Sequence, residues 1–261
     1  MKLKFYLGTA SKWPIDRLMR MHWFPLLSTY RLRTNWLYDL CRIAGTRNLQ
    51  MIFDVGANIG QTAKDISGYF PKARIHSFEP VNDTFLILGK NLRRLPNVHA
   101  HKLAMGRQSK FLNIELQGSS LFNSLSHVPG ASVGGARVER IEVTTLDEFC
   151  AAQHIDTIDV LKTYAQGCDV DVLAGGDKLI SNGRVPFIYS EVSFQPDDKT
   201  NTHFLDLNEH LLSRRFRLFG FYDQWGGVDG GRGCLQFCNA LYINPEALSE
   251  RFRPVDSLPS R

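Results

Sequence analysis

The predicted architecture starts from the segment Met51-Ile-Phe-Asp-Val-Gly-Ala-Asn-Ile-Gly60. Its apolar beginning is typical of a buried strand that ends around Asp54. Gly56 and Gly60 follow at a spacing of four, and a helical pattern begins directly after them. A strand, a tight turn and a helix N-terminus form the geometry in which backbone N–H groups meet a nucleotide-like ligand. We therefore expect a ligand at this turn, where the two glycines let it approach the backbone closely.

Strand and helix patterns alternate along most of the chain that follows. The expected strands are residues 49–55, 74–79, 98–104, 157–162, 187–194, 216–221 and 235–243, and the expected helices are residues 60–70, 81–95, 145–153, 170–180 and 202–214. This order predicts an α/β fold with a doubly wound, mostly parallel seven-stranded sheet. The last two strands are joined by a Gly-rich loop, residues 226–233, without room for a crossover helix. We therefore expect the last strand to be reversed.

Residues 110–116 and 138–143 interrupt this rhythm, because apolar and polar residues alternate in both, as in half-exposed strands. Between them lies a Ser- and Gly-rich tract, residues 118–135. We expect a hairpin-like insertion with a mobile tip, which is either a loop that closes over a substrate or a slack surface loop. The expected domains are a basic N-terminal helical extension (1–48), a main domain (49–245, with the insertion at 106–144) and a C-terminal tail (246–261).

The net charge of +5 belongs to the N-terminal segment. Residues 1–50 contain nine basic and two acidic residues, which leaves 22 of the 31 basic and 24 of the 26 acidic residues for the rest of the chain. Trp13, Trp23 and Phe24 lie among these basic residues. The segment is either a weak contact surface for a membrane or an acidic partner, or a solvated arm that packs onto the main domain. We favour the arm, because the basic residues follow no helical stripe.

Residues 34–45 have a clear helical pattern within this basic segment. Thr34 is suited to cap the helix and Gly45 to end it, and the apolar residues between them fall on one face. We expect this helix to cover one edge or the mouth of the main domain.

Composition is that of an ordinary folded protein, with 43% hydrophobic and 22% charged residues. No apolar run approaches the roughly eighteen residues that a membrane span needs. The five cysteines lack a metal-binding spacing, and no carboxylate spacing accompanies His203 and His210, which we expect at the surface. We therefore predict reduced thiols, a cytoplasmic protein and no bound metal. The basic segment matches no nucleic-acid-binding fold, so no nucleic-acid partner is expected.

Glu79 is a further residue that we expect to contact the ligand. It follows Gly60 by 19 residues and ends the second expected strand, where a carboxylate can accept both hydroxyls of a ribose. A dinucleotide site would need a third glycine in the pattern G-x-G-x-x-G, which this turn lacks. The spacing Asp54-x-Gly56-x-x-x-Gly60 instead resembles motif I of S-adenosylmethionine-dependent methyltransferases. The structural alternatives are a turn-stabilising carboxylate at Asp54 and a solvated strand end at Glu79.

Over residues 49–244 the chain resembles the FkbM-type methyltransferase family. The matching segments are Asp54-Val-Gly-Ala-Asn-Ile-Gly60, Ser77-Phe-Glu-Pro80, Thr144-Thr-Leu-Asp147, Val160-Leu-Lys-Thr-Tyr-Ala-Gln-Gly-Cys-Asp-Val-Asp-Val-Leu-Ala-Gly175 and Asn239-Ala-Leu-Tyr-Ile-Asn244. Many methyltransferases share the glycine motif, whereas the signature from Lys162 to Gly175 is the specific one.

This resemblance implies the fold, the reaction and the cofactor. The fold is the class I methyltransferase sheet, which is Rossmann-like, and the reaction transfers a methyl group from S-adenosyl-L-methionine to a hydroxyl oxygen. The acceptor is a sugar, a glycan or a secondary metabolite. The implied cofactor contacts are Asp54, Gly56, Asn58, Gly60 and Glu79.

An alcohol acceptor also needs a general base, because its hydroxyl proton is lost during the reaction. The candidates near strand carboxyl ends are Tyr164, Asp169, Glu191 and His154. Glu191 is our first choice, since an acid in an apolar strand is costly unless it is used. The alternative is that Glu191 forms a structural pair with Lys162.

Tyr164 stands where the family signature usually has an aspartate. A tyrosine is neutral at physiological pH and is a poor ligand for hard cations, so we expect no metal in the mechanism. Three hypotheses follow for the function. The first is an active O-methyltransferase with Lys162, Tyr164 and Glu191 in its catalytic site. The second is an S-adenosylmethionine-binding relative with impaired catalysis, and the third, more remote, is an NAD-dependent oxidoreductase.

Overall fold

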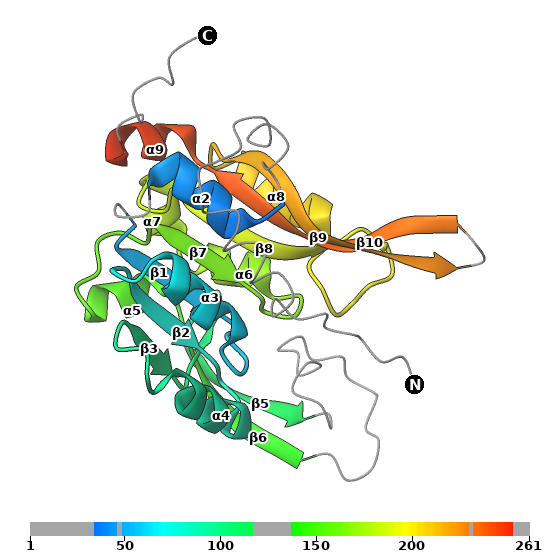
Figure 1. Ribbon diagram of the computed structural model, residues 1–261. Helices are drawn as coiled ribbons and strands as arrows, with labels where there is room; N and C mark the ends of the chain where they lie inside the picture. Colours follow the sequence, from blue (N-terminus) through cyan, green and yellow to red (C-terminus); the bar gives the residue numbers. More distant parts are fainter. Residues whose placement is uncertain (1–33, 46–48, 117–136, 230–231, 253–261) are drawn as a thin grey trace.

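The core of the molecule is a seven-stranded sheet in which β10 alone runs against the other strands (Figure 1). The computed structural model describes residues 34–45, 49–116, 137–229 and 232–252, and this sheet is drawn from them. Its strands are, in spatial order, β3 (Val98–His101), β2 (Arg74–Phe78), β1 (Met51–Val55), β7 (Val160–Thr163), β8 (Phe187–Ser193), β10 (Arg232–Ile243) and β9 (Arg217–Asp229). The order and the reversed strand confirm the expected class I methyltransferase sheet.

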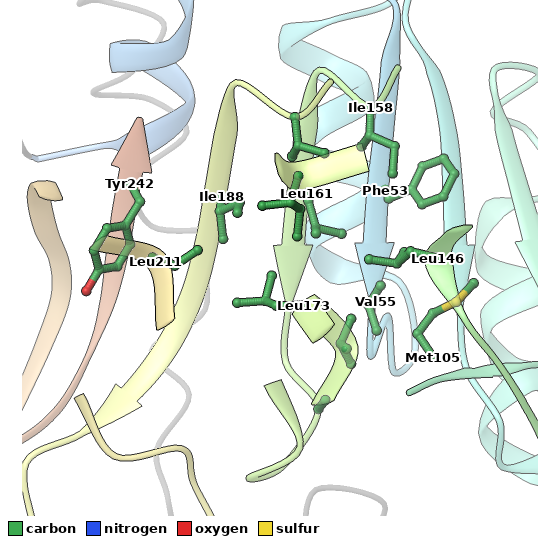
Figure 2. Close-up of a cluster of buried hydrophobic side chains, with 14 of the residues drawn as sticks. Phe53, Val55, Met105, Leu146, Ile158, Leu161, Leu173, Ile188, Leu211 and Tyr242 are labelled. Carbon is green, nitrogen blue, oxygen red and sulfur yellow. The ribbon is translucent and has the colours of Figure 1, made fainter. Parts of the chain in front are cut away.

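Four helices cover one face of the sheet, which we call the α5–α8 face. They are α5 (Leu146–Ala152), α6 (Asp169–Ala174), α7 (Asp177–Ser181) and α8 (Phe204–Leu212). Figure 2 shows how Phe53, Leu161 and Ile188 of three strands lie against Leu146 and Leu173 of these helices. Central parallel strands are buried on both faces and therefore consist of nearly continuous apolar runs. This is why the sequence predicts them without alternation.

The opposite face, which we call the α2–α3 face, combines an apolar core with polar strand ends. It is covered by α2 (Trp36–Ala44), α3 (Gln61–Tyr69) and α9 (Pro245–Arg251), while α4 (Asn82–Leu92) packs beside α3. Ile52 and Val160 belong to its core. Because side chains alternate along a strand, Asp54 and Lys162 point to this same face, two residues further on. Glu191 of β8 also lies on it, two residues after the buried Tyr189.

Helix α2 lies over the middle of the α2–α3 face, and not at an edge or mouth as expected. Its Trp36 ring stacks on Tyr189 of β8 with centroids 4.1 Å apart. The cap is Asn35, whose side chain accepts the Leu37 N–H, and not Thr34. The remainder of the basic segment, with its predicted arm or membrane contact, lies outside the described residues.

The predicted insertion forms a second, three-stranded sheet with the order β4-β6-β5. The antiparallel pair of β5 (Lys110–Leu116) and β6 (Arg137–Thr144) confirms the expected hairpin, and its tip lies outside the described residues. The strand expected over residues 98–104 is corrected, since it divides into β3 of the main sheet and β4 (Ala104–Met105) of the second sheet.

The helix expected over residues 170–180 is wrong, because α6 and α7 are separate helices around Gly175 and Gly176. A Cβ atom on Gly175 would lie 2.0 Å from the carbonyl oxygen of Gly106. Two backbone segments therefore touch here, and they leave room for glycine alone. Apolar periodicity carries no sign of such a contact.

The last two strands form a long hairpin arm. The antiparallel pairing is confirmed, but the loop expected over residues 226–233 is wrong, because Gly226 pairs with Leu235 and the ladder continues to Asp229 and Arg232. In Figure 1 this arm, drawn in orange, extends well beyond the ends of the other strands.

The expected domain boundaries stay a prediction, but α2 and the end of α9, which lie outside residues 49–245, share the core of the main sheet. Leu40 of α2 and Phe252, at the end of α9, belong to the same buried cluster as Ile52 of β1. Across the part of the chain that the structure describes, no helix has the length and apolar character of a membrane span.

Candidate active site

A pocket lies at the carboxyl ends of β1, β2, β7 and β8, the edge at which open α/β sheets bind ligands. Its polar lining includes Asn58, Gln61, Glu79, Lys162, Tyr164, Gln166, Glu191 and Asn201. Its apolar lining includes Val81, Leu103, Met105 and Ile114. The structure thus brings together Asn58, Glu79, Lys162, Tyr164 and Glu191, as the sequence predicts. Most of the apolar wall was missed, because Leu103, Met105 and Ile114 come from the second sheet and the loop before it.

The turn after β1 has three residues with positive φ: Gly56 at +70°, Asn58 at +50° and Gly60 at +90°. A Cβ atom on Gly56 would lie 2.1 Å from the Tyr164 carbonyl oxygen, and one on Gly60 would lie 2.9 Å from Leu88 of α4. Contact with another backbone segment therefore requires glycine at position 56, and the positive φ favours glycine at both positions. The expected role of both glycines in the approach of a ligand stays a prediction.

Gly56→Ala is expected to lower the free energy of unfolding by more than about 2 kcal/mol. The new Cβ would force the end of β7 away from the turn, and the positive φ adds backbone strain. Gly68→Ala is the matched control, because a Cβ at that position of α3 meets no atom within 4 Å. In a helix it should stabilise the protein by about 0.5–1 kcal/mol. Urea denaturation compares the two, and effects of the same sign would contradict the prediction.

Lys162 forms a buried ion pair with Asp54 behind this turn. Its Nζ lies 2.8 Å from Asp54 Oδ1, and the two side chains are 2% and 0% exposed. The ammonium group also donates to the carbonyl oxygens of Val55 (3.3 Å) and Gly56 (3.1 Å). The pair therefore holds the turn in place, in line with the turn-stabilising alternative for Asp54. The alternative pairing of Lys162 with Glu191 is wrong.

Glu79 is a buried carboxylate that faces the pocket from the end of β2. Its Oε2 accepts the Asn58 N–H at 3.1 Å, and its Oε1 accepts the Val81 N–H at 3.0 Å. Burial raises the pKa of Glu79 to about 7, although the two N–H bonds and the charge of Lys162 act to lower it. The solvated strand end considered for this residue is wrong, and its carboxyl group titrates near neutral pH.

Tyr164 is held by a chain of side-chain hydrogen bonds that crosses to the hairpin arm. Its hydroxyl donates to Asn239 Oδ1, and Asn239 Nδ2 donates to Asp223 Oδ2 at 3.2 Å. The Tyr189 hydroxyl donates to the same Asp223 oxygen at 3.3 Å. Burial and the charge of Asp223 raise the pKa of Tyr189 well above its ordinary value. Asn239 and Asp223 were not predicted as part of the site, since no spacing in the sequence links them to Tyr164.

Glu191 lines the pocket from β8 and is half-buried. The register of β8 and β10 places it opposite Asn239, beside the hydrogen-bonded chain of Tyr164. Burial and the charge of Glu191 together raise the pKa of the Cys238 thiol to about 12. Among the four candidate bases it is the carboxylate that lines the pocket.

The other two candidate bases are not placed for chemistry. Asp169 accepts the Ala165 N–H at 3.0 Å and the Thr202 hydroxyl at 2.8 Å, so its buried carboxylate holds the loops together. His154 lies in the turn between α5 and β7, and therefore at the amino end of the sheet, away from the pocket. Placing His154 near a strand carboxyl end was wrong.

The two histidines of α8 are corrected as well. His203 caps the helix by accepting the Leu205 N–H at 3.3 Å. His210 is partly buried, and burial and the charge of Arg214 lower its pKa to about 4. Neither is the exposed surface residue that we expected.

Comparison with known proteins identifies related sequences. A family model described as the methyltransferase FkbM domain matches residues 54–218. The 2-O-methyltransferase NoeI of Sinorhizobium fredii (strain NBRC 101917 / NGR234) is 26% identical over 159 residues. This match covers 56% of the present chain and 64% of NoeI, so the chain spans less than two thirds of that relative.

Solved structures are similar at lower identity. Methyltransferase FkbM from Methylobacillus flagellatus KT is 19% identical with a TM-score of 0.49, over 76% of this chain and 44% of that protein. TrmK of M. capricolum, in complex with S-adenosylhomocysteine, is 10% identical with a TM-score of 0.44, over 81% of this chain and 69% of TrmK. The site described above does not depend on either likeness.

Proposed function

The chain belongs to the FkbM methyltransferase family, and from this premise we propose that it transfers a methyl group from S-adenosylmethionine to a hydroxyl oxygen of a sugar or glycan. The observation that carries the proposal is the pocket in which Glu79, Lys162 and Glu191 meet at the carboxyl edge of the sheet. The name of the relative, a 2-O-methyltransferase, supports oxygen as the acceptor atom.

The residues of the pocket fit the cofactor. Each oxygen of Glu79 accepts one backbone N–H and keeps a second lone pair, which a ribose hydroxyl would use. Val81, Leu103 and Met105 offer an apolar wall for a flat adenine ring. When bound, S-adenosylmethionine supplies a methyl group that is activated by the positive charge on its sulfur. Asp54 is fully buried and acts on the cofactor site through Lys162.

In the proposed reaction, the acceptor oxygen would form a bond to the methyl carbon as the bond from that carbon to sulfur breaks. S-adenosylhomocysteine would leave, and the hydroxyl proton would pass to the Glu191 carboxylate. Glu191 suits this role because it lines the pocket, whereas Asp169 lies outside the lining and holds two loops together. The Tyr164 hydroxyl donates a hydrogen bond to Asn239 Oδ1, so we assign it to orienting groups in the site and not to the role of the base. The pocket wall holds the acceptor oxygen in line with the methyl group, which is a large part of such catalysis.

The pKa of Glu79 predicts cofactor binding that depends on pH. Ribose hydroxyls donate to the ionised carboxylate, so the affinity for S-adenosylhomocysteine should rise about tenfold from pH 6 to pH 8. Folding responds with the opposite sign. Between pH 4.5 and about 7 the folded protein keeps a proton on Glu79 that the unfolded chain loses, so this carboxyl lowers the free energy of unfolding as the pH rises.

Calorimetric titrations at pH 6, 7 and 8 measure this dependence. Glu79→Gln should bind S-adenosylhomocysteine more weakly and with a flat profile, because an amide does not titrate. Glu209→Gln, at an exposed position of α8, should keep the wild-type profile. A wild-type slope in Glu79→Gln would show that another group is responsible.

The proposed function is tested by titration with S-adenosylmethionine, S-adenosylhomocysteine and NAD. We expect binding of the two methionine derivatives and none of NAD. Affinity for NAD alone would overturn the proposal in favour of an oxidoreductase. Transfer of a labelled methyl group to a panel of glycosides and simple alcohols then measures turnover, with a methyl ether as the expected product.

One observation favours a second function, a cofactor-binding protein with impaired catalysis. Where the family usually has an aspartate, the ring of Tyr164 lies under Lys162, with 4.0 Å from Nζ to the ring centroid, and supplies no carboxylate. Tyr164→Asp separates the two functions. Activity that appears only in this variant would support the impaired protein, whereas robust wild-type activity that is lost in Glu191→Gln would support the enzyme.

A further inference from the structure

The hairpin arm carries a stacked aromatic pair, of which Trp225 is exposed. Trp225 of β9 lies opposite Phe237 of β10, and their rings stack with centroids 5.0 Å apart and planes 3° from parallel. Trp225 is 49% exposed, which is unusual for so large an apolar side chain. Phe237 and Asn239 are two residues apart on one strand, so the aromatic pair lies on the α2–α3 face, together with Glu191.

The strand register places this pair just beyond the candidate general base. On β10, Asn239 lies opposite Glu191 and Phe237 lies opposite Ser193, the last residue of β8. A step of two residues along a strand is about 7 Å. Phe237 therefore lies about this distance past Glu191, and Trp225 lies beside it. Glu79 follows β2, whereas the aromatic pair belongs to β10 and β9, and β1, β7 and β8 lie between β2 and β10. The aromatic pair and Glu79 therefore flank the pocket from opposite sides.

A bulge in β9 aims Trp225 at this position. Tyr222 pairs with Asn239 and Trp225 pairs with Phe237, so three steps on β9 match two on β10. The irregularity includes Asp223, a non-glycine residue with φ of +46°. Such a backbone is costly unless contacts hold it, and Asp223 accepts a hydrogen bond from Asn239. Bulges next to active sites commonly re-aim a side chain.

From this placement we infer that Trp225, with Phe237 stacked against one face of its ring, forms a platform for a second ring of the acceptor, next to the ring that is methylated. The inference rests on the proposed function and makes the acceptor an oligosaccharide or a glycoside of at least two rings. One face of a pyranose presents C–H groups, which gain dispersion and hydrophobic contact on an aromatic ring, while its rim hydroxyls stay hydrated. The step from Glu191 to the platform is about the length of one sugar unit.

Binding to the platform is tested on the 15N-labelled full chain by following the indole N–H signals of its four tryptophans. Trp225→Phe assigns the signal of Trp225. The probes are maltose, cellobiose and N,N′-diacetylchitobiose, each compared with its own monosaccharide. We expect a disaccharide to shift the Trp225 signal at concentrations at which its monosaccharide does not. No shift with any of the disaccharides, or a shift that follows protein concentration alone and so reports a second copy on the platform, would overturn the inference.

The second readout is turnover with a two-ring acceptor that the wild-type enzyme methylates. Trp225→Ala should raise KM about tenfold, the size of one lost ring contact, with kcat and the affinity for S-adenosylhomocysteine unchanged. Trp225→Phe should stay within about threefold of wild type, since it keeps an aromatic face. Leu212→Ala is the control, because Leu212 is an exposed apolar residue at the far end of α8.

These two readouts separate the inference from the proposed function. An unchanged KM in Trp225→Ala, in a wild-type enzyme that turns over, overturns the platform and leaves the methyltransferase proposal standing. A Trp225 shift with a disaccharide, in a protein that transfers no methyl group, supports the platform and counts against the proposed reaction.

Discussion

Replacing Glu191 by glutamine is expected to lower kcat by about 10²- to 10⁴-fold, the range that a general base contributes. The amide has the size of the carboxylate and keeps its place in the pocket, opposite Asn239 on β10, but it cannot take a proton from the acceptor hydroxyl. The affinity for S-adenosylhomocysteine should stay unchanged, because Glu79 and the apolar wall carry that contact in the proposed site.

Single-turnover and steady-state rates across a range of pH measure this effect. With S-adenosylmethionine at saturation, so that the pH dependence of its binding through Glu79 does not limit the rate, the acidic limb of the wild-type profile should disappear in Glu191→Gln. Glu209→Gln, an exposed substitution of the same kind on α8, should leave both rate and profile as they are. A Glu191→Gln enzyme with kcat within threefold of wild type would remove Glu191 from the reaction.

Lys162→Met is expected to lower the free energy of unfolding by about 3–5 kcal/mol and to weaken cofactor binding. Methionine fills a similar volume but leaves the Asp54 carboxylate buried without its counter-charge. It also leaves the carbonyl oxygens of Val55 and Gly56 without their donor. These groups belong to the turn after β1, so the loss of stability and the loss of affinity should appear in the same variant.

The double variant Asp54→Asn/Lys162→Met tests the cause. If the uncompensated charge is the main loss, neutralising it should recover about half of the stability that the single variant lost. Lys178→Met, at an exposed position of α7, should stay within about 0.5 kcal/mol of wild type. Urea denaturation gives all three values. A double variant that is no more stable than Lys162→Met would show that packing, and not charge, accounts for the loss.

The main sheet was predictable because its central strands are short apolar runs between turn residues, and because parallel order follows from alternation. The errors lie where two backbones meet. Contact between Gly175 and Gly106 divides a helix that apolar periodicity predicts as one. The glycines of the arm predict a loop, yet Gly226 pairs with Leu235 in the ladder between β9 and β10. Local sequence does not indicate this pairing.

The sequence was sufficient to predict which site residues lie at the carboxyl ends of the strands. The position of Glu79 after β2 and of Lys162 in β7 follows from the sheet rule, and the structure brings both to the pocket. Contacts between side chains of different strands could not be predicted from the sequence, because they depend on the register of the strands. Asp54 pairs with Lys162 in adjacent strands, and Tyr164 meets Asn239 through the reversed strand β10. A one-residue slip would turn either side chain to the other face.

The position of β10 also determines the order in which parts of the sheet can form while the chain is synthesised. β10 lies between β8 and β9, so β9 has no partner in the sheet and β8 keeps one open edge until β10 is available. Asn239 joins Glu191 and Tyr164 at that same moment. On the ribosome the side of the pocket that is built by β1, β2 and β7 can form first, while the side that Asn239 completes waits for residues near 240. Two exposed strand edges during that interval are a ready target for chaperones or for unwanted pairing between nascent chains.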